Sequence, residues 1–184
     1  ALVPCAHPPM EGLMPGPDIR EALEKIARAI AVEPGKASVK GAPATARLLD
    51  GLRCEVTGPN GEALVTDMPV AMGGGGSAPN PGWLFRASLA SCAATAVALR
   101  AAMLGVRLRT LEVTVESMAD LRGNLGLDDK VSAGLSSLVT RVRIGADDLS
   151  EDELRQLVQW GEAHSPMTCT VRDSPAPSLS VEVV

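Results

Sequence analysis

The segment from Pro81 to about Leu104 constrains the fold most, because it reads as one long helix without a polar side. Asn80 is a good N-cap, and Pro81 suits the first helical position because its missing N–H would have no intrahelical partner there. Gly105 marks the expected end of the helix. Its apolar residues nearly encircle the axis: Leu84, Ala87, Leu89, Ala90, Ala93, Ala96, Val97, Leu99 and Met103. We therefore predict a central helix that is covered on most sides.

The chain has the features of a soluble, cytoplasmic protein. The apolar stretch between Arg86 and Arg100 is thirteen residues long, which is short of the roughly 20 that span a membrane. The segment 1–17 is rich in proline and lacks the basic start and continuous apolar stretch of a secretory signal. We expect a flexible tail there.

The cysteines and the charge argue against several classes of function. Cys5, Cys54, Cys92 and Cys169 are widely spaced and form no CxxC pair, so we expect free thiols rather than a zinc or thioredoxin-type site. Cys5 with His7 is too small a set for a metal site, and no cofactor is expected. The net charge of −5 and the scarcity of aromatic residues exclude nucleic acid as an expected partner.

The segment 18–34 predicts an amphipathic helix that precedes the main domain. Asp18 can cap it, Glu21 can complete a capping box, and Pro34 ends it. Its narrow apolar stripe consists of Ile19, Leu23, Ile26, Ala27 and Ile30. We expect this stripe to dock on the main body rather than on a membrane.

The main domain, 44–184, contains several strand patterns. Residues 45–70 are predicted to be extended and broken by a turn at 58–61. The segments 111–115 and 138–144 alternate apolar and polar residues, as does 179–183, which predicts a closing strand. Grouped strands followed by a helix indicate an antiparallel α+β fold.

The segments between the strands are a Gly-rich loop, a polar loop and a second helix. Gly73–Ser77 is not followed by the Lys-Ser/Thr pair of a P-loop, so we interpret it as a loop without phosphate binding. The segment 122–134 is predicted to be a long loop. Ser150 and Glu153 form the capping box of a helix that ends before Pro166.

The residues around the central helix resemble the OsmC/Ohr superfamily. The resemblance rests on Gly74-Gly75, Asn80-Pro81-Gly82-Trp83-Leu84-Phe85, Ala90-Ser91-Cys92, Gly105 and Ala163-His164-Ser165-Pro166. It extends over 44–184. It implies an OsmC-like fold, with antiparallel sheets packed on two central helices, built as an intertwined homodimer whose reactive centres lie at the subunit interface.

The resemblance also implies a peroxide chemistry for the cysteines. Active relatives reduce organic hydroperoxides with two cysteines, and Cys92 matches the cysteine that attacks the peroxide to form a sulfenic acid. The second cysteine is expected directly before Pro166, where this chain has Ser165. Cys169 is the thiol nearest to that position in the sequence and is the candidate for the second cysteine's role. It lies beyond Pro166, however, and is expected to start another element.

The resemblance also implies that an arginine and a glutamate take part in the reaction of active relatives. The glutamate that orients the arginine is expected after Pro81, where this chain has Gly82. Arg53 is matched to the arginine, and Arg47 is the alternative.

A cysteine in an apolar environment needs a nearby cation or oriented donors to ionise. The N-terminus of the central helix cannot supply the charge, because Cys92 lies about three turns beyond Asn80 and the dipole effect fades within about one turn. Arg86 and Arg100 do not sit beside Cys92 on the helix. His164 is expected to face solvent and complement the dipole of the second helix, and the alternative is a proton donor.

Two functions remain open. The first is a single-cysteine, thiol-dependent organic hydroperoxide reductase of the oxidative stress response, with Cys92 as nucleophile and an external thiol as reductant. The second is a non-catalytic protein that binds a small hydrophobic ligand in a pocket lined by Cys92. Ser165 and Gly82 stand where the family cysteine and glutamate are expected, which favours the binding protein. The retained Cys92 favours the reductase.

Overall fold

The computed structural model describes residues 18–183, which divide into one unit ending at Ser38 and another beginning at Val39. The tail predicted for 1–17 lies outside the described residues. The first unit contains α1 (Ile19–Val32) and the 3-10 helix η1 (Pro34–Ala37). Asp18 caps α1 as predicted, since its carboxylate accepts a hydrogen bond from the Glu21 N–H at 3.1 Å. No residue of α1 is buried, and the docking of its apolar stripe stays a prediction.

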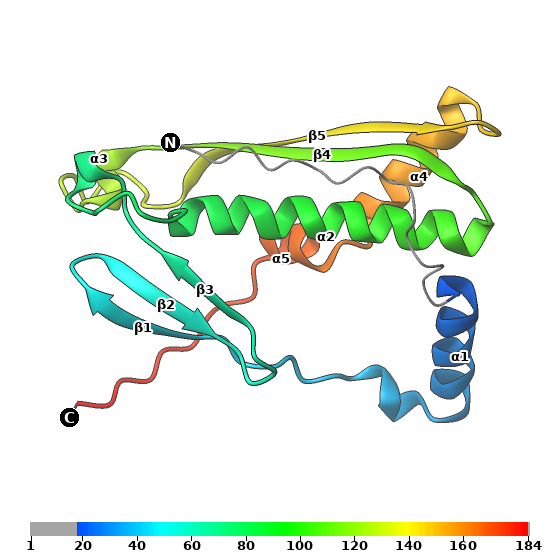
Figure 1. The fold of residues 1–184 in the computed structure, drawn as a ribbon, viewed down its shortest axis with the longest axis horizontal. Helices are drawn as coiled ribbons and strands as arrows, with labels where there is room; N and C mark the ends of the chain where they lie inside the picture. Colours follow the sequence, from blue (N-terminus) through cyan, green and yellow to red (C-terminus); the bar gives the residue numbers. More distant parts are fainter. Residues whose placement is uncertain (1–17, 184) are drawn as a thin grey trace. The chain divides into compact units, whose positions relative to one another are not determined.

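The second unit contains two antiparallel sheets and the helices α2 to α5 (Figure 1). Its strands are β1 (Thr45–Asp50), β2 (Arg53–Thr57), β3 (Ala63–Thr66), β4 (Leu108–Ala119) and β5 (Leu135–Ala146). Its helices are η2 (Val70–Met72), α2 (Pro81–Leu104), α3 (Leu121–Asn124), α4 (Glu151–Ala163) and α5 (Pro166–Asp173). The predicted α+β class with antiparallel sheets is confirmed.

The β4–β5 pair follows the predicted alternation. Leu111, Val113 and Val115 are half-buried, and the residues between them are exposed. Ion pairs cross the exposed face, where Arg141 meets Glu116. The apolar face of the pair therefore packs on the helices, where β4 contacts α2 and β5 contacts α4.

Two details of the strand prediction are wrong. The region 45–70 contains three strands, because the chain also reverses at Gly51, whose φ of +50° is in the left-handed region that favours glycine. The closing strand predicted for 179–183 does not form, and the described residues from 174 onward contain no strand. An alternating segment becomes a strand only when another strand supplies its hydrogen bonds, and neither sheet in the described chain supplies them here.

Helix α2 begins and ends where the sequence predicts. The Asn80 side chain accepts a hydrogen bond from the Trp83 N–H at 2.9 Å, and Pro81 occupies the first turn. Gly105 ends the helix with a φ of +71°, and its N–H bonds to the carbonyls of the last turn. The caps therefore fix both ends of the helix that carries Cys92.

The described chain covers α2 on fewer sides than predicted. The buried residues form one stripe, made of Leu89, Ala93, Ala96, Val97 and Ala101. Trp83 remains 50% exposed and Leu104 54% exposed, because β4, α4 and α5 together cover only that stripe. The length and composition of α2 would also suit a membrane-spanning helix. The short stretch between Arg86 and Arg100 therefore does not by itself exclude one. Its buried stripe packs against β4, α4 and α5, which makes α2 the core helix of this unit.

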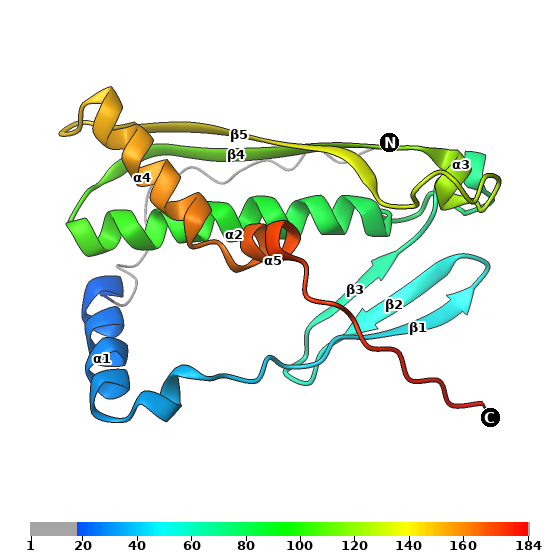
Figure 2. The ribbon, with the colours of Figure 1, turned by 180° about the vertical axis from the view of Figure 1, so that it is seen from behind.

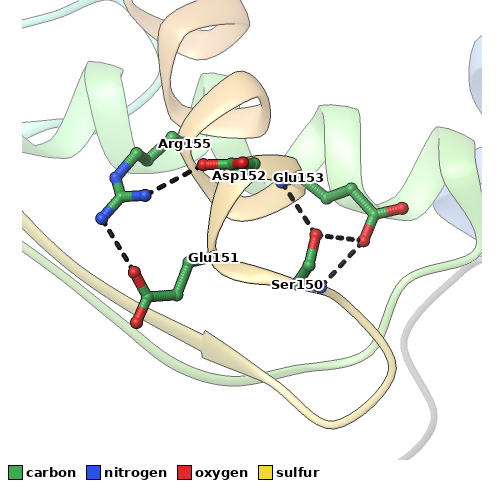
Figure 3. A network of polar contacts seen from close by, with 5 residues as sticks. All are labelled: Ser150, Glu151, Asp152, Glu153 and Arg155. Atoms are coloured by element: carbon green, nitrogen blue, oxygen red, sulfur yellow. Dashed lines mark hydrogen bonds and ion pairs between the residues drawn. The ribbon is translucent and has the colours of Figure 1, made fainter.

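The N-terminus of α4 forms the predicted capping box (Figure 3). Both the N–H and the hydroxyl of Ser150 donate to the Glu153 carboxylate, at 2.8 and 2.7 Å. These bonds, the hydroxyl first, lower the pKa of Glu153. Arg155 adds ion pairs with Glu151 and Asp152 at 2.9 and 3.0 Å. The start of α4 is thus held by local contacts that the sequence encodes directly.

Helices α2 and α4 approach closely at Gly161, and Figure 2 shows α4 and α5 together along α2. A Cβ at Gly161 would collide with the Val97 side chain and lie 3.0 Å from the Val97 backbone nitrogen. Val97 and its neighbours Ala101 and Leu157 are the buried centre of the core. The missing side chain at Gly161 therefore sets the distance between the two helices.

The Gly-rich loop before α2 is organised by one buried carboxylate. Asp67 is only 2% exposed, and its oxygens accept hydrogen bonds from the N–H groups of Met68, Gly75 and Ser77 and from the Ser77 hydroxyl. The two bonds from Ser77, the backbone one first, lower the pKa of Asp67. Gly74 passes so near the Met68 carbonyl that a Cβ would not fit. The loop is therefore a carboxylate-binding turn that leads into α2.

We predict that Gly161→Ala destabilises the protein by about 1 to 3 kcal/mol, because the added methyl group forces α4 away from Val97. Chemical denaturation of both proteins measures the difference. Gly41→Ala is the matched control, since a Cβ at that glycine meets nothing within 4 Å. Equal unfolding free energies for Gly161→Ala and the unmodified protein would contradict the close packing.

We also predict that Asp67→Asn lowers the unfolding midpoint, because an amide NH₂ would face the N–H donors of the loop. A carboxylate with a lowered pKa stabilises the fold above the unfolded value of about 3.9, and this contribution is lost as the pH falls through the folded value. The difference between the two proteins should therefore be largest above about pH 5 and shrink toward pH 3. Asp129→Asn, at an exposed position, is the control.

Candidate functional site

Cys92 lies on α2 and opens into a pocket of about 410 Å³. One wall is a stripe of α2, in which Cys92, Thr95 and Leu99 recur at helical spacing. The opposite wall comes from the end of α4 and the start of α5. The full lining is Ser91, Cys92, Thr95, Ala96, Leu99, Trp160, His164 and Pro166. The arrangement places a half-buried thiol in a mainly apolar pocket of small-molecule size.

The junction between α4 and α5 builds the second wall. His164 is the C-cap of α4, Ser165 is the N-cap of α5, and Pro166 is its first residue. Ser165 is fully buried, and its hydroxyl accepts hydrogen bonds from the Thr168 N–H at 3.4 Å and the Thr168 hydroxyl at 3.1 Å. The position matched to the second cysteine therefore holds a helix-capping hydroxyl.

His164 is fixed by contacts on α4. Its ring stacks on the Trp160 indole with the centroids 3.9 Å apart and the planes 9° from parallel. Its Nδ1 lies 2.7 Å from the Trp160 carbonyl oxygen. The Arg100 guanidinium lies 4.9 Å from the centroid of the same indole. These contacts link α2 to the end of α4 beside the pocket.

No arginine or lysine lines the Cys92 pocket within the described chain. Arg53 lies on β2 and pairs with Asp50 at 3.1 Å, and its buried Nε has no hydrogen-bond partner. Arg47 lies on β1, opposite Glu55 of β2. Arg86 donates to the Ser117 hydroxyl at 3.2 Å. The structure of one chain thus brings neither matched arginine into this pocket, and the roles of Arg53 and Arg47 stay predictions.

Cys169 lies on α5 and has contacts of its own. Its thiol donates to the Ala163 carbonyl at 3.3 Å, and the Arg172 guanidinium donates to its sulfur at 3.2 Å. Asp173 and then Cys169 raise the pKa of Arg172. Cys169 does not line the Cys92 pocket, and Cys54, Cys92 and Cys169 are all free thiols. Its role as a resolving residue stays a prediction.

Gly82, the position matched to the glutamate, lies in the first turn of α2. A Cβ there would come within 3.7 Å of Arg86 Nη1. The described residues contain no cluster of three His, Cys, Asp or Glu side chains that could hold a metal.

The resemblance implies that the Ser165–Pro166 junction lies near Cys92, but Trp160 was not predicted to line the pocket. Trp160 and His164 are four residues apart, so they share a face of α4, but the sequence does not say that this face meets Cys92. The available signal was the unusual step from the end of one helix directly into Pro166. It implies a sharp junction, and such junctions often line sites.

Comparison with solved structures places the fold among OsmC and Ohr proteins. An organic hydroperoxide resistance protein OsmC from Legionella pneumophila is 24% identical, with a TM-score of 0.56 over 73% of this chain and 91% of that chain. An OsmC-like protein from Mycoplasma pneumoniae is 16% identical, with a TM-score of 0.63 over 74% and 91%. The organic hydroperoxide resistance protein OhrB of Bacillus subtilis is 22% identical, with a TM-score of 0.51 over 74% and 94%.

The comparison with curated proteins gave no match. The family model described as OsmC-like protein matches residues 74–180, more than half of the chain. This segment includes most of the Gly-rich loop before α2, Cys92 and the junction at Ser165. On this match and on the shared fold, the chain belongs to the OsmC-like protein family.

Proposed function

We propose that this chain is a thiol-dependent organic hydroperoxide reductase that uses Cys92 alone as its nucleophile. The observation that carries the proposal is the pocket of about 410 Å³, which gives a small apolar molecule access to the Cys92 side of α2. Its walls include Leu99, Trp160 and Pro166, which suit the hydrocarbon part of a hydroperoxide. Solved neighbours of the same fold are organic hydroperoxide resistance proteins.

The reaction follows from the chemistry of a thiolate and a hydroperoxide. The Cys92 thiolate attacks the terminal oxygen of ROOH, an S–O bond forms and the O–O bond breaks. The electron pair of the O–O bond leaves with the RO group, which takes a proton and departs as the alcohol ROH. Sulfur is oxidised by two electrons to sulfenic acid, and the peroxide is reduced.

The reductant in this proposal is an external thiol. Ser165 cannot form a disulfide, and its hydroxyl is occupied in capping α5. Cys169 directs its sulfur toward Ala163 and Arg172. Two small thiols can return Cys92 to the free thiol, with one disulfide and one water as products.

The second candidate is a non-catalytic protein that holds a small hydrophobic ligand in the same pocket. It is favoured by the absence of arginine and lysine from the pocket lining of the described chain. It is also favoured by Gly82 and Ser165 at the positions matched to a glutamate and a cysteine. Cys92 would then line the pocket as a small apolar side chain.

We place this activity in a cytoplasmic homodimer. Exposed apolar side chains on the β1–β3 sheet and its first turn support a partner chain, with Leu48 of β1 63%, Leu52 of the β1–β2 turn 46% and Leu64 of β3 42% exposed. Free cysteines support a reducing compartment.

We predict that cumene hydroperoxide converts Cys92 to the sulfenic acid faster than it oxidises Cys54 or Cys169. Stopped-flow kinetics and mass spectrometry of trapped peptides measure the site and the rate. Cys92→Ser should abolish the fast phase and turnover with dithiothreitol, and Cys169→Ser, the matched control, should retain both. Slow oxidation spread over the cysteines would reject the reductase and leave the binding protein.

A further inference from the structure

A second pocket lies between the last turns of α2 and helix α4, and its volume is about 420 Å³. Among the described residues, Trp160 is the one that lines both this pocket and the pocket at Cys92. Leu104 of α2, Leu149 and Leu157 of α4 form an apolar wall. The pocket is therefore a separate space of small-molecule size, with a wall that suits a hydrocarbon group.

Arg100 of α2 brings a positive charge to this pocket. Its guanidinium carbon lies 4.9 Å from the centroid of the Trp160 ring, and His164 stacks on the same side chain at 3.9 Å. The cation–π contact holds the guanidinium in place but does not neutralise its charge. Within residues 18–183 no carboxylate forms an ion pair with Arg100. The pocket thus presents a half-buried, positioned cation beside an apolar wall.

The other polar side chains of the lining limit the charge that the pocket can accept. Glu153 has its carboxylate engaged by the cap of α4, since its Oε2 accepts the bonds from both Ser150 donors (Figure 3). The lining then carries one positive and one negative charge. A singly charged anion can pair with Arg100, whereas a doubly charged phosphate would meet stronger repulsion from Glu153. The Gln156 amide also lines the pocket and can donate a hydrogen bond to an anion.

We infer that this pocket binds a small monocarboxylate with a hydrocarbon body. The planar carboxylate accepts hydrogen bonds from the fork of the Arg100 guanidinium, which matches it in geometry. The hydrocarbon part packs on the leucine wall and covers Leu104, which is 54% exposed in the unliganded chain. Binding involves no covalent step and is independent of the reaction proposed for Cys92.

The test is a titration of the full chain with sodium octanoate, followed by isothermal titration calorimetry. We expect saturable binding to one site per chain, and a dissociation constant about 10-fold higher or more in Arg100→Gln. Arg100→Lys keeps the charge near Trp160 but not the fork, so its affinity should lie between the two. Arg107→Gln, which removes an exposed cation just beyond α2, is the matched control and should bind as the unmodified protein does. The absence of saturable binding, or equal affinity in Arg100→Gln, would overturn the inference.

A second pair of variants distinguishes this pocket from the one at Cys92. Gln156→Glu adds a negative charge to the lining of the Arg100 pocket, and Thr95→Glu adds one to the lining of the Cys92 pocket. Both positions are exposed, so both variants are expected to keep the unfolding midpoint of the unmodified protein. We expect Gln156→Glu to weaken octanoate binding and Thr95→Glu to leave it unchanged. The reverse result would place octanoate at Cys92 and reject the Arg100 site.

Discussion

The contact between α2 and α4 is the constraint on which the rest of the structure depends. Gly161 has no side chain, so α4 can approach the backbone of Val97 on α2. This close approach places the end of α4 opposite Cys92. The pocket therefore forms between α2 and the α4–α5 junction, which are far apart in the chain. The β4–β5 pair then covers the same core from another side. The distance between the two helix axes thus determines the shape of the candidate site.

Local interactions were predictable from the sequence, because the residues that make them are close in the chain. Asn80 and Gly105 define α2, and Ser150 with Glu153 starts α4, as the patterns indicated. The fold class followed from these elements and from the motif around Cys92. The prediction of a closing strand at 179–183 was wrong, because a strand needs a partner strand and one segment of sequence does not indicate which that is. The prediction that α2 is covered on most sides was wrong for a similar reason. The burial of a helix depends on the elements that pack against it.

The candidate site was predictable in part. Cys92 could be selected from its place on α2 and from the family motif, and the structure gives it a pocket. The place of Trp160 and His164 beside Cys92 could not be predicted, because it depends on how α4 packs on α2. Within its own chain Arg53 pairs with Asp50, so the role that the resemblance implies for it stays a prediction.

The cap at Ser165 links the redox chemistry proposed for this chain to the order of a short helix. The buried hydroxyl holds the first turn of α5 through Thr168, and a thiol is a much weaker acceptor of such bonds. A cysteine at this position would supply a second sulfur but would loosen the turn that has to present it. A change from the proposed one-cysteine chemistry to a two-cysteine chemistry would therefore require a compensating change elsewhere in α5.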